Sequence, residues 1–166
     1  RGQRAPELAL ALHFRLRDSR LGGEPLTGGG DVELSGARVR KADLDLDAAG
    51  NRVSAKGAFG APGDRLTVTV AAPRLASLGL PTIAGDLAGS LLLAGSVKAP
   101  ELSADLRSTR LALAGAGELR GLVVRARLGE GEQGPLSGQI RLDVFDFPGG
   151  TVREVAIDAD GVRARH

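Results

Sequence analysis

The chain has 166 residues, a formal net charge of +2, and 42% hydrophobic and 25% charged residues, which is ordinary for a folded domain. It contains no Cys, Trp, Tyr or Met and only 4 Phe. These absences exclude disulfides and thiolate chemistry, and they leave few side chains large enough to fill the space between two packed sheets. Composition therefore favours a thin or open architecture. The basic residues form no block, which argues against nucleic-acid binding.

Apolar and polar residues alternate along most of the chain, and this period of two is typical of β-strands. The clearest run covers residues 7–17, after which residues 18–24 are expected to form a turn. A helical turn is expected only at residues 73–81, where two prolines bracket Leu75 and Leu78. The other alternating runs lie at residues 25–36, 37–51, 52–60, 65–72, 85–106, 111–115, 119–129, 135–145 and 151–162.

Glycines interrupt the apolar side of several runs. In residues 85–106, Gly85 and Gly89 share the parity of Leu87 and Leu91, so part of this face has almost no side chain. Glycine within a strand permits the bulges and bends that a curved sheet requires. No helix is long enough to connect parallel strands, so we expect about ten strands in antiparallel hairpins. The predicted fold is all-β: an elongated, curved, mainly antiparallel sheet forming an open hydrophobic groove, with a closed β-barrel or sandwich as the alternative.

A loose internal repeat accompanies this pattern. Residues 25–28 (PLTG) match residues 135–138 (PLSG), and residues 81–85 (PTIAG) begin in a related way. The uneven spacing argues against a regular β-helix and favours hairpins that extend one sheet. We therefore expect residues 1–166 to be a single β-groove segment, internal to a longer and repetitive β protein.

Three groups of residues suggest chemistry and are better explained by strands and turns. Asp43, Asp45 and Asp47 have the spacing of a calcium loop, but the glycine and the final glutamate of such a loop are missing, and alternate strand positions explain the spacing. Residues 115–121 (GAGELRG) resemble a dinucleotide loop, yet no helix follows, so a hairpin turn with a bulge is expected. The two histidines form no cluster in the sequence. We predict no catalytic residue, no metal site, no cofactor and no enzymatic activity.

The apolar side of the predicted sheet must be covered by a second layer, by its own curvature or by a ligand. A trough of aliphatic side chains with few aromatics would hold flexible acyl chains without specific contacts, whereas in a barrel or a sandwich the same side chains would only pack together. The candidate groove residues, for lipid or for a client protein, are Leu8, Leu10, Leu12, Phe14, Leu16, Val32, Leu34, Leu44, Leu46, Leu66, Val68, Val70, Leu87, Leu91, Leu93, Leu102, Leu106, Leu122, Val124, Leu128, Ile140 and Leu142.

Three stretches carry a family resemblance: residues 49–79 (AGNRVSAKGAFGAPGDRLTVTVAAPRLASLG), 83–106 (IAGDLAGSLLLAGSVKAPELSADL) and 155–166 (VAIDADGVRARH). They are similar to the β-rich periplasmic region of the TamB family, the inner-membrane subunits of the translocation and assembly module, within the AsmA-like group of bridge-like lipid transfer proteins. The resemblance runs from about Leu26 to the end of the chain. It implies a taco-shaped periplasmic β-groove, in a protein anchored in the inner membrane.

The same resemblance implies a role in phospholipid transport and in outer-membrane protein assembly, including that of autotransporters. The implied partners are phospholipid acyl chains, unfolded outer-membrane proteins, and an Omp85-type, TamA-like protein that binds parts outside this segment. No catalytic residues are implied.

Two functional hypotheses remain open on the sequence. The groove is either a hydrophobic conduit for lipid, or part of a chaperone-like scaffold whose open edge strands pair with unfolded outer-membrane β-strands. A segment of a secreted, β-rich adhesin is a third class with less support.

Overall fold

A computed structural model of the protein describes residues 9–129 and 134–162. These residues form one antiparallel sheet of eleven strands and a single 3₁₀ helix, η1. The elements in chain order are β1 (Ala9–Leu21), β2 (Glu24–Ser35), β3 (Arg38–Ala48), β4 (Asn51–Phe59), β5 (Arg65–Ala72), η1 (Leu75–Leu78), β6 (Ile83–Gly85), β7 (Leu87–Gly95), β8 (Pro100–Leu113), β9 (Gly117–Leu128), β10 (Pro135–Phe147) and β11 (Gly150–Val162).

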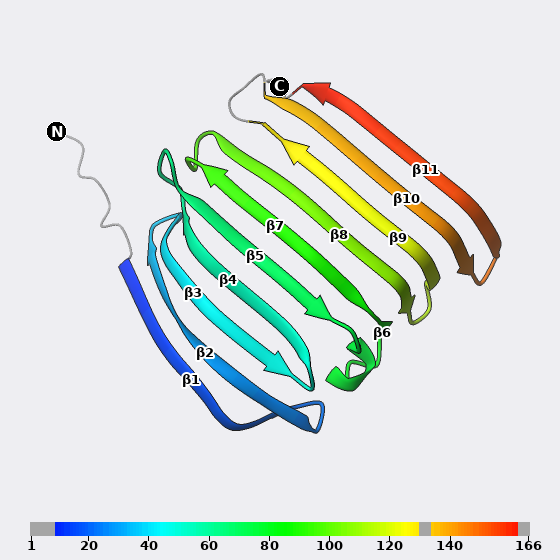
Figure 1. The fold of residues 1–166 in the computed structure, drawn as a ribbon, viewed down its shortest axis with the longest axis horizontal. Coiled ribbons are helices and arrows are strands. Elements are labelled where there is room, and N and C mark those ends of the chain that lie inside the picture. The colour runs from blue at the N-terminus through cyan, green and yellow to red at the C-terminus, as the bar shows by residue number, and fades with distance from the viewer. Residues whose placement is uncertain (1–8, 130–133, 163–166) are drawn as a thin grey trace.

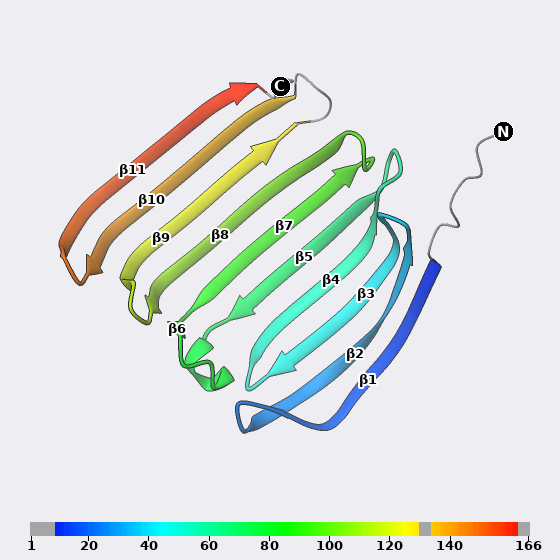
Figure 2. The same cartoon turned by 180° about the vertical axis from the view of Figure 1, so that it is seen from behind.

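The strands lie side by side in the order β1-β2-β3-β4-β5-β7-β8-β9-β10-β11, and short β6 pairs with β8 beyond the end of β7 (Figure 1). Each strand is antiparallel to its neighbour, so the sheet is a series of hairpins. Both views show a single layer of long strands that bend along their length (Figures 1 and 2). Because β1 and β11 do not pair with each other, the sheet is open. The prediction of an open, curved, antiparallel sheet is confirmed, and the chain forms neither the barrel nor the sandwich.

The predicted turn at residues 18–24 is wrong in its extent. Strand β1 continues to Leu21, and the turn is formed by Gly22 and Gly23. Asp18 instead lies in a bulge of β1, with a φ of 52°, where the register against β2 shifts between Leu16 and Ser19. A polar residue that tolerates positive φ is typical of turns and bulges alike, so composition alone does not distinguish them.

Helix η1 occupies the single place where the sequence predicts a helical turn, and Asn51 fixes it to the sheet. The Asn51 side chain is buried, with 5% of its surface exposed. Its amide nitrogen donates to the carbonyl oxygens of Ala48 and Arg74 and to the hydroxyl of Ser77, each at 3.0 Å. Its amide oxygen accepts a hydrogen bond from the backbone N–H of Arg74 at 2.9 Å. One side chain therefore ties the β3–β4 turn to the segment after β5.

Asn51→Ala is expected to destabilise the protein by about 1–3 kcal/mol, because it removes a buried side chain and leaves the part-buried N–H of Arg74 without its partner. Denaturant unfolding measures the change. The control is Thr69→Val, at an exposed position of β5 on the face of the sheet opposite to the Asn51 side chain. Its free energy of unfolding should stay within about 0.5 kcal/mol of the parent value. Equal midpoints for the parent and Asn51→Ala would contradict a fixing role for this side chain.

The sheet has little conventional core. The accessible surface of the whole chain is 11062 Å², whereas a compact protein of 17.0 kDa exposes about 7,700 Å². No side chain of the described residues is fully buried, and the buried apolar residues are mostly alanines: Ala42, Ala48, Ala72 and Ala94, together with Leu66, Leu75 and Leu142. The larger apolar side chains therefore remain partly open to solvent on one face of the sheet.

Candidate hydrophobic groove

The apolar side chains form three rows that cross the sheet from β1 to β11, because residues directly opposite each other on neighbouring strands share a face. The Leu12 row consists of Leu12, Val32, Ala42, Gly57, Leu66, Leu93, Leu102, Leu128, Leu136 and Gly161. The Phe14 row consists of Phe14, Gly30, Leu44, Ala55, Val68, Leu91, Ala104, Ala126, Gly138 and Ala159. The Leu16 row consists of Leu16, Gly28, Leu46, Val53, Val70, Gly89, Leu106, Val124, Ile140 and Ile157.

These rows define the apolar face, and they contain no polar side chain. Phe14 is the single aromatic residue in them, and Gly30 lies between Phe14 and Leu44. A Cβ atom at Gly30 would lie 2.6 Å from the Cβ of Leu44, so this position has no room for a side chain. Gly and Ala interrupt the larger aliphatic residues at some positions of each row, and the apolar face is almost entirely aliphatic.

Beyond the Leu16 row, four strands each break the alternation of side chains once. On β8, Leu106 pairs with Gly89 of β7 and Leu111 pairs with Gly85 of β6. The two glycines are four residues apart, so they face the same side of the sheet. The two leucines are five residues apart, so one extra residue of β8 lies between them. The partners of Leu106 and Leu111 on β9, β10 and β11 are also five residues apart: Val124 and Leu119, Ile140 and Phe145, Ile157 and Val152. One extra residue in each strand keeps both sets on the apolar face.

Asp86 stabilises this break where β6 meets β7. Its carboxylate accepts hydrogen bonds from the backbone N–H groups of Thr109 at 2.9 Å and Arg110 at 3.0 Å, and its own N–H donates to the carbonyl of Arg110 at 2.9 Å. Two residues of β8 thus lie opposite one residue of the neighbouring chain segment, which is the pattern of a β-bulge. The bulge lets Leu111 and Leu113 lie on the apolar face.

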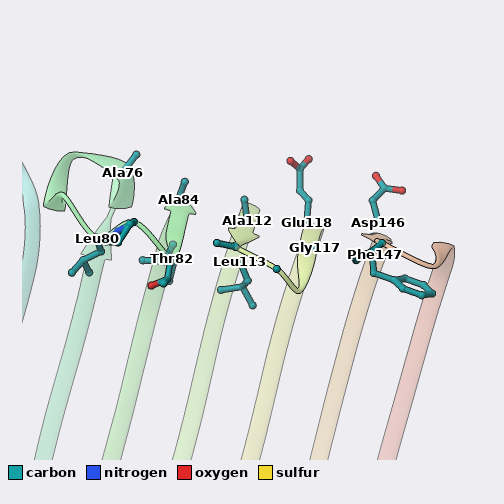
Figure 3. Close-up of a pocket in the computed structure, with 15 residues that line it drawn as sticks. Ala76, Leu80, Thr82, Ala84, Ala112, Leu113, Gly117, Glu118, Asp146 and Phe147 are labelled. Atoms are coloured by element: carbon teal, nitrogen blue, oxygen red, sulfur yellow. The ribbon is translucent and has the colours of Figure 1, made fainter.

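An open hollow of about 630 Å³ lies at the strand ends near η1 and the β10–β11 turn. Leu80, Leu113 and Phe147 point to one side of the sheet there, whereas Glu118 and Asp146 point to the other (Figure 3). Leu80 and Phe147 are 44% and 38% exposed. Since Leu113 pairs with Ile83 next to Leu111, the hollow continues the apolar face to the end of the strands.

The opposite face, here called the polar face, carries exposed ion pairs. His13 Nδ1 and Asp31 Oδ1 are 2.6 Å apart, and this hydrogen bond, with Lys41 nearby, lowers the pKa of the Asp31 carboxyl. Arg141 donates two hydrogen bonds of 2.9 Å to Asp158 and lowers its pKa in the same way. These groups are solvated, so the pairs contribute little to stability.

The polar face offers no metal site among the residues that the structure describes. Asp43, Asp45 and Asp47 lie on alternate positions of β3, as their spacing in the sequence predicts. Arg52 of β4 is 3.6 Å from Asp45 and 3.5 Å from Asp47, so a cation already neutralises part of this carboxylate row. Within residues 9–129 and 134–162, no helix is long and apolar enough to cross a membrane.

A family model described as the TamB N-terminal domain matches residues 18–166. The chain belongs to the TamB family. This confirms the family resemblance of the sequence, and the TamB family is an envelope-spanning transport and assembly module, not a known enzyme family. No curated protein and no solved structure matches the chain.

The structure of this TamB-family sheet brings nearly all the candidate groove residues to the apolar face. Most lie in the three rows, and Leu10 and Leu34 pair directly beside the Leu12 row. Leu87, Leu122 and Leu142 lie one alternating step beyond the Leu16 row, and Leu8 lies outside the described residues. That these residues bind lipid or a client stays a prediction.

Several residues of the apolar face are absent from the candidate set. Val53 and Ile157 belong to the Leu16 row. The alternation of apolar and polar residues within their own strands is the sequence pattern that predicts them on this face. Leu111, Leu119 and Phe145 lie across the break in alternation from Leu106, Val124 and Ile140, so parity counted from those residues places them on the opposite face. The apolar face of this TamB-family domain is thus wider than the candidate groove residues alone indicate.

Proposed function

We propose that the apolar face binds phospholipid acyl chains and forms part of a periplasmic groove along which lipid moves between the inner and outer membranes. The observation that carries this proposal is the set of three uncovered rows, which run across the whole sheet without a polar side chain. Ten strands about 4.8 Å apart give a path of roughly 45 Å, longer than the roughly 30 Å hydrocarbon core of a bilayer.

The chemistry of the rows favours acyl chains over other ligands. Each CH₂ group removed from water contributes about 0.8 kcal/mol, and an aliphatic surface without hydrogen-bonding groups makes no demand on the ligand beyond being apolar. A folded client protein would need polar partners on such a large surface. Membership of the TamB family adds support, since that family is an assembly and transport module.

The proposed setting follows from the family. The segment is one part of a longer, repetitive β-groove whose full-length protein is anchored in the inner membrane. An Omp85-type, TamA-like outer-membrane protein binds elsewhere on that protein, and lipid movement serves outer-membrane assembly, including that of autotransporters.

A photo-crosslinking amino acid at Leu91 is expected to label phospholipid in the periplasm, because Leu91 lies in the Phe14 row. The same probe at Leu92 is the matched control: it follows Leu91 on β7 but lies on the polar face, opposite Thr67 and Ser103. Mass spectrometry of the labelled protein measures the adducts. Equal lipid labelling at Leu91 and Leu92, or none at either, would count against a lipid groove.

The second candidate function is a chaperone-like scaffold, and the observation that favours it is the pair of open edges. Strands β1 and β11 each have 13 residues and a single neighbour in the sheet. An unfolded outer-membrane β-strand could add to either edge by main-chain hydrogen bonds. In that case a proline placed in β1 or β11 should reduce client capture, while a charge at Leu91 should not.

A further inference from the structure

The apolar face has one further row, which lies one alternating step beyond the Leu16 row and is here called the Leu87 row. It consists of Leu26, Ala48, Asn51, Ala72, Leu87, Ser108, Leu122, Leu142 and Val155. The residues of the Phe14 and Leu16 rows are all at least partly exposed. In the Leu87 row, several residues are only 3–8% exposed: Ala48, Asn51, Ala72, Ser108 and Leu142. The apolar face is therefore covered along the Leu87 row and uncovered beside it.

Helix η1 covers the Leu87 row on β3, β4 and β5. The Asn51 side chain, which belongs to this row, donates a hydrogen bond of 3.0 Å to the hydroxyl of Ser77. Leu75 of η1 is itself only 7% exposed. A Cβ atom on Gly22 would lie 2.2 Å from the carbonyl oxygen of Leu78, so the β1–β2 turn also contacts η1. The helix thus forms a wall at this end of the first five strands.

On β8–β11 the wall is formed by the strand tips. Ser108 and Leu142 are 3% and 8% exposed, although the described residues form a single layer with no other element over these strands. Their cover therefore comes from side chains of the same face, and Leu111, Leu119 and Phe145 lie on that face just beyond the break in alternation. A bend away from the apolar face would expose the Leu87 row, so the break bends the tips toward the apolar face.

A network of ion pairs and hydrogen bonds on the polar side joins the four tips. Arg110 of β8 donates a hydrogen bond of 2.6 Å to Glu118 of β9. Arg120 of β9 lies 3.4 Å from Glu118 and donates to Asp146 of β10, which accepts a hydrogen bond of 2.6 Å from Thr151 of β11. Glu118 and Asp146 point away from the apolar side chains of the hollow (Figure 3). The strand ends that carry η1 and these tips are here called the walled end.

The opposite strand ends, here called the open end, carry three turns, at residues 36–37, 60–64 and 96–99 (Figure 1). No helix among the described residues lies there. In the Leu12 row, which borders this end, Ala42 and Leu66 are buried, but Leu12 and Leu136 are 49% and 47% exposed. An acyl chain that lies along the strands is therefore confined at the walled end, and a polar group attached to it reaches water at the open end.

Four basic residues flank the turns of the open end: Arg38, Arg40, Arg65 and Lys98. All four are exposed, and none has an ion-pair partner among the described residues. The turns adjoin each other, since the N–H of Val97 donates to the carbonyl of Gly60 at 3.3 Å. A hollow of about 280 Å³ between two of the turns is lined by Ser35, Arg38, Val39, Arg40, Ala61 and Asp64.

The carboxylates of the open end leave these cations available. Asp64 accepts a hydrogen bond of 2.8 Å from the N–H of Ala61. Glu33 lies opposite Lys41 in the register of β2 and β3, and Glu101 lies opposite Ala94. Guanidinium and ammonium groups bind phosphate by charge-assisted hydrogen bonds. The open end therefore offers charge complementarity to a phosphate, whereas the cations in the network at the walled end are already paired.

We propose that a phospholipid lies along the strands with its phosphate bound at the open end and its acyl chains directed toward the walled end. The phosphate contacts are made by Arg38, Arg40, Arg65 and Lys98. This inference rests on the proposed function and adds to it the orientation of the lipid and a phosphate site. The long stems of Arg and Lys let their charged heads reach past the strand ends.

Tryptophan fluorescence tests the orientation, because the chain has no Trp of its own. Val97→Trp places the probe at the open end, Phe147→Trp places it at the walled end, and Ile140→Trp places it in the Leu16 row. The lipid is palmitoyl-oleoyl phosphatidylcholine, loaded on the protein and freed from vesicles by gel filtration. It carries either a nitroxide on the choline or bromine atoms on the acyl chain.

The headgroup nitroxide is expected to quench Val97→Trp more strongly than Phe147→Trp, and the brominated chain is expected to quench Ile140→Trp. Equal headgroup quenching at the two ends, or stronger quenching of Phe147→Trp, would overturn the orientation. No quenching of Ile140→Trp by the brominated chain would instead overturn the proposed function, on which the orientation rests.

Removal of two charges tests the phosphate site. Arg38→Gln combined with Arg40→Gln is expected to weaken the binding of phosphatidylcholine about tenfold, because charge-assisted contacts are lost. Binding of diacylglycerol with the same acyl chains should not change, since it has no phosphate. The matched control is Arg15→Gln combined with Arg17→Gln, an exposed pair with the same spacing on β1, which should bind both lipids like the parent. Equal loss for both lipids, or no loss for phosphatidylcholine, would refute a phosphate site at these residues.

Discussion

Leu91→Asp is expected to lower phospholipid labelling of the apolar face at least tenfold, equivalent to about 1.4 kcal/mol of binding free energy. Leu91 lies in the Phe14 row, with Val68 and Ala104 opposite it on the neighbouring strands. A carboxylate there is too short to reach water past an acyl chain, so lipid binding would have to desolvate a charge. The labelling probe is placed at Val124, in the adjacent Leu16 row.

The matched control is Leu92→Asp, one residue along β7 on the polar face. It carries the same change in charge and side-chain size, and its row already contains Lys56 and Arg127. Labelling at Val124 should therefore stay near the parent value. Circular dichroism of both variants establishes that the sheet is intact. Undiminished labelling of folded Leu91→Asp would mean that lipid does not occupy these rows.

Gly89→Ala is expected to destabilise the sheet by more than about 2 kcal/mol. Gly89 has a φ of 147°, which L-residues rarely adopt, and a Cβ atom there would lie closer than 3.0 Å to backbone atoms of Asp105 and Leu106 on β8. Since those contacts are backbone atoms of a paired strand, β7 and β8 would have to separate to accept the methyl group. Chemical denaturation measures the loss.

Gly138→Ala is the control, because Gly138 also lies in an apolar row and its φ is not positive. The nearest atom to a Cβ at Gly138 is the Cβ of Ala159, at 3.9 Å, which is ordinary contact. This change should be neutral or should stabilise by about 0.4–1 kcal/mol, through the unfolded state. If Gly89→Ala and Gly138→Ala have the same free energy of unfolding, the close approach of β7 and β8 at Gly89 does not contribute to stability.

Alternation in the sequence predicts much of the apolar face, because side-chain direction in a strand is a local property. Leu44 and Leu46 on β3, like Leu91 and Leu93 on β7, lie where their parity assigns them. The absence of long helical patterns and the scarcity of aromatic residues likewise predict an open antiparallel sheet. Local patterns do not give the register between strands, and so the continuous rows appear only in the structure.

The misplaced features share one physical cause, which is a single residue inserted into a strand. At Asp18 the inserted residue looks like the start of a turn, so β1 is predicted to end too early. At Thr109 a bulge exchanges the two faces of β8, and this depends on the carboxylate of Asp86, 23 residues away in the chain. The alternation shifts parity near Thr109 and Phe145 in the sequence, but without the register between strands it does not indicate which face Leu111 and Phe145 occupy.

The single layer of strands described above also governs how the domain holds together. Each strand contacts little besides its two neighbours, so the free energy of folding is close to a sum of strand terms and terms between adjacent strands, as in repeat proteins. A perturbation at β7 is transmitted outward one strand at a time, through β5 on one side and β8 on the other. Unfolding is therefore cooperative only between adjacent strands of the sheet. The strands that pair with β1 and β11 from outside this domain would determine how far the unfolding of one strand extends along the sheet.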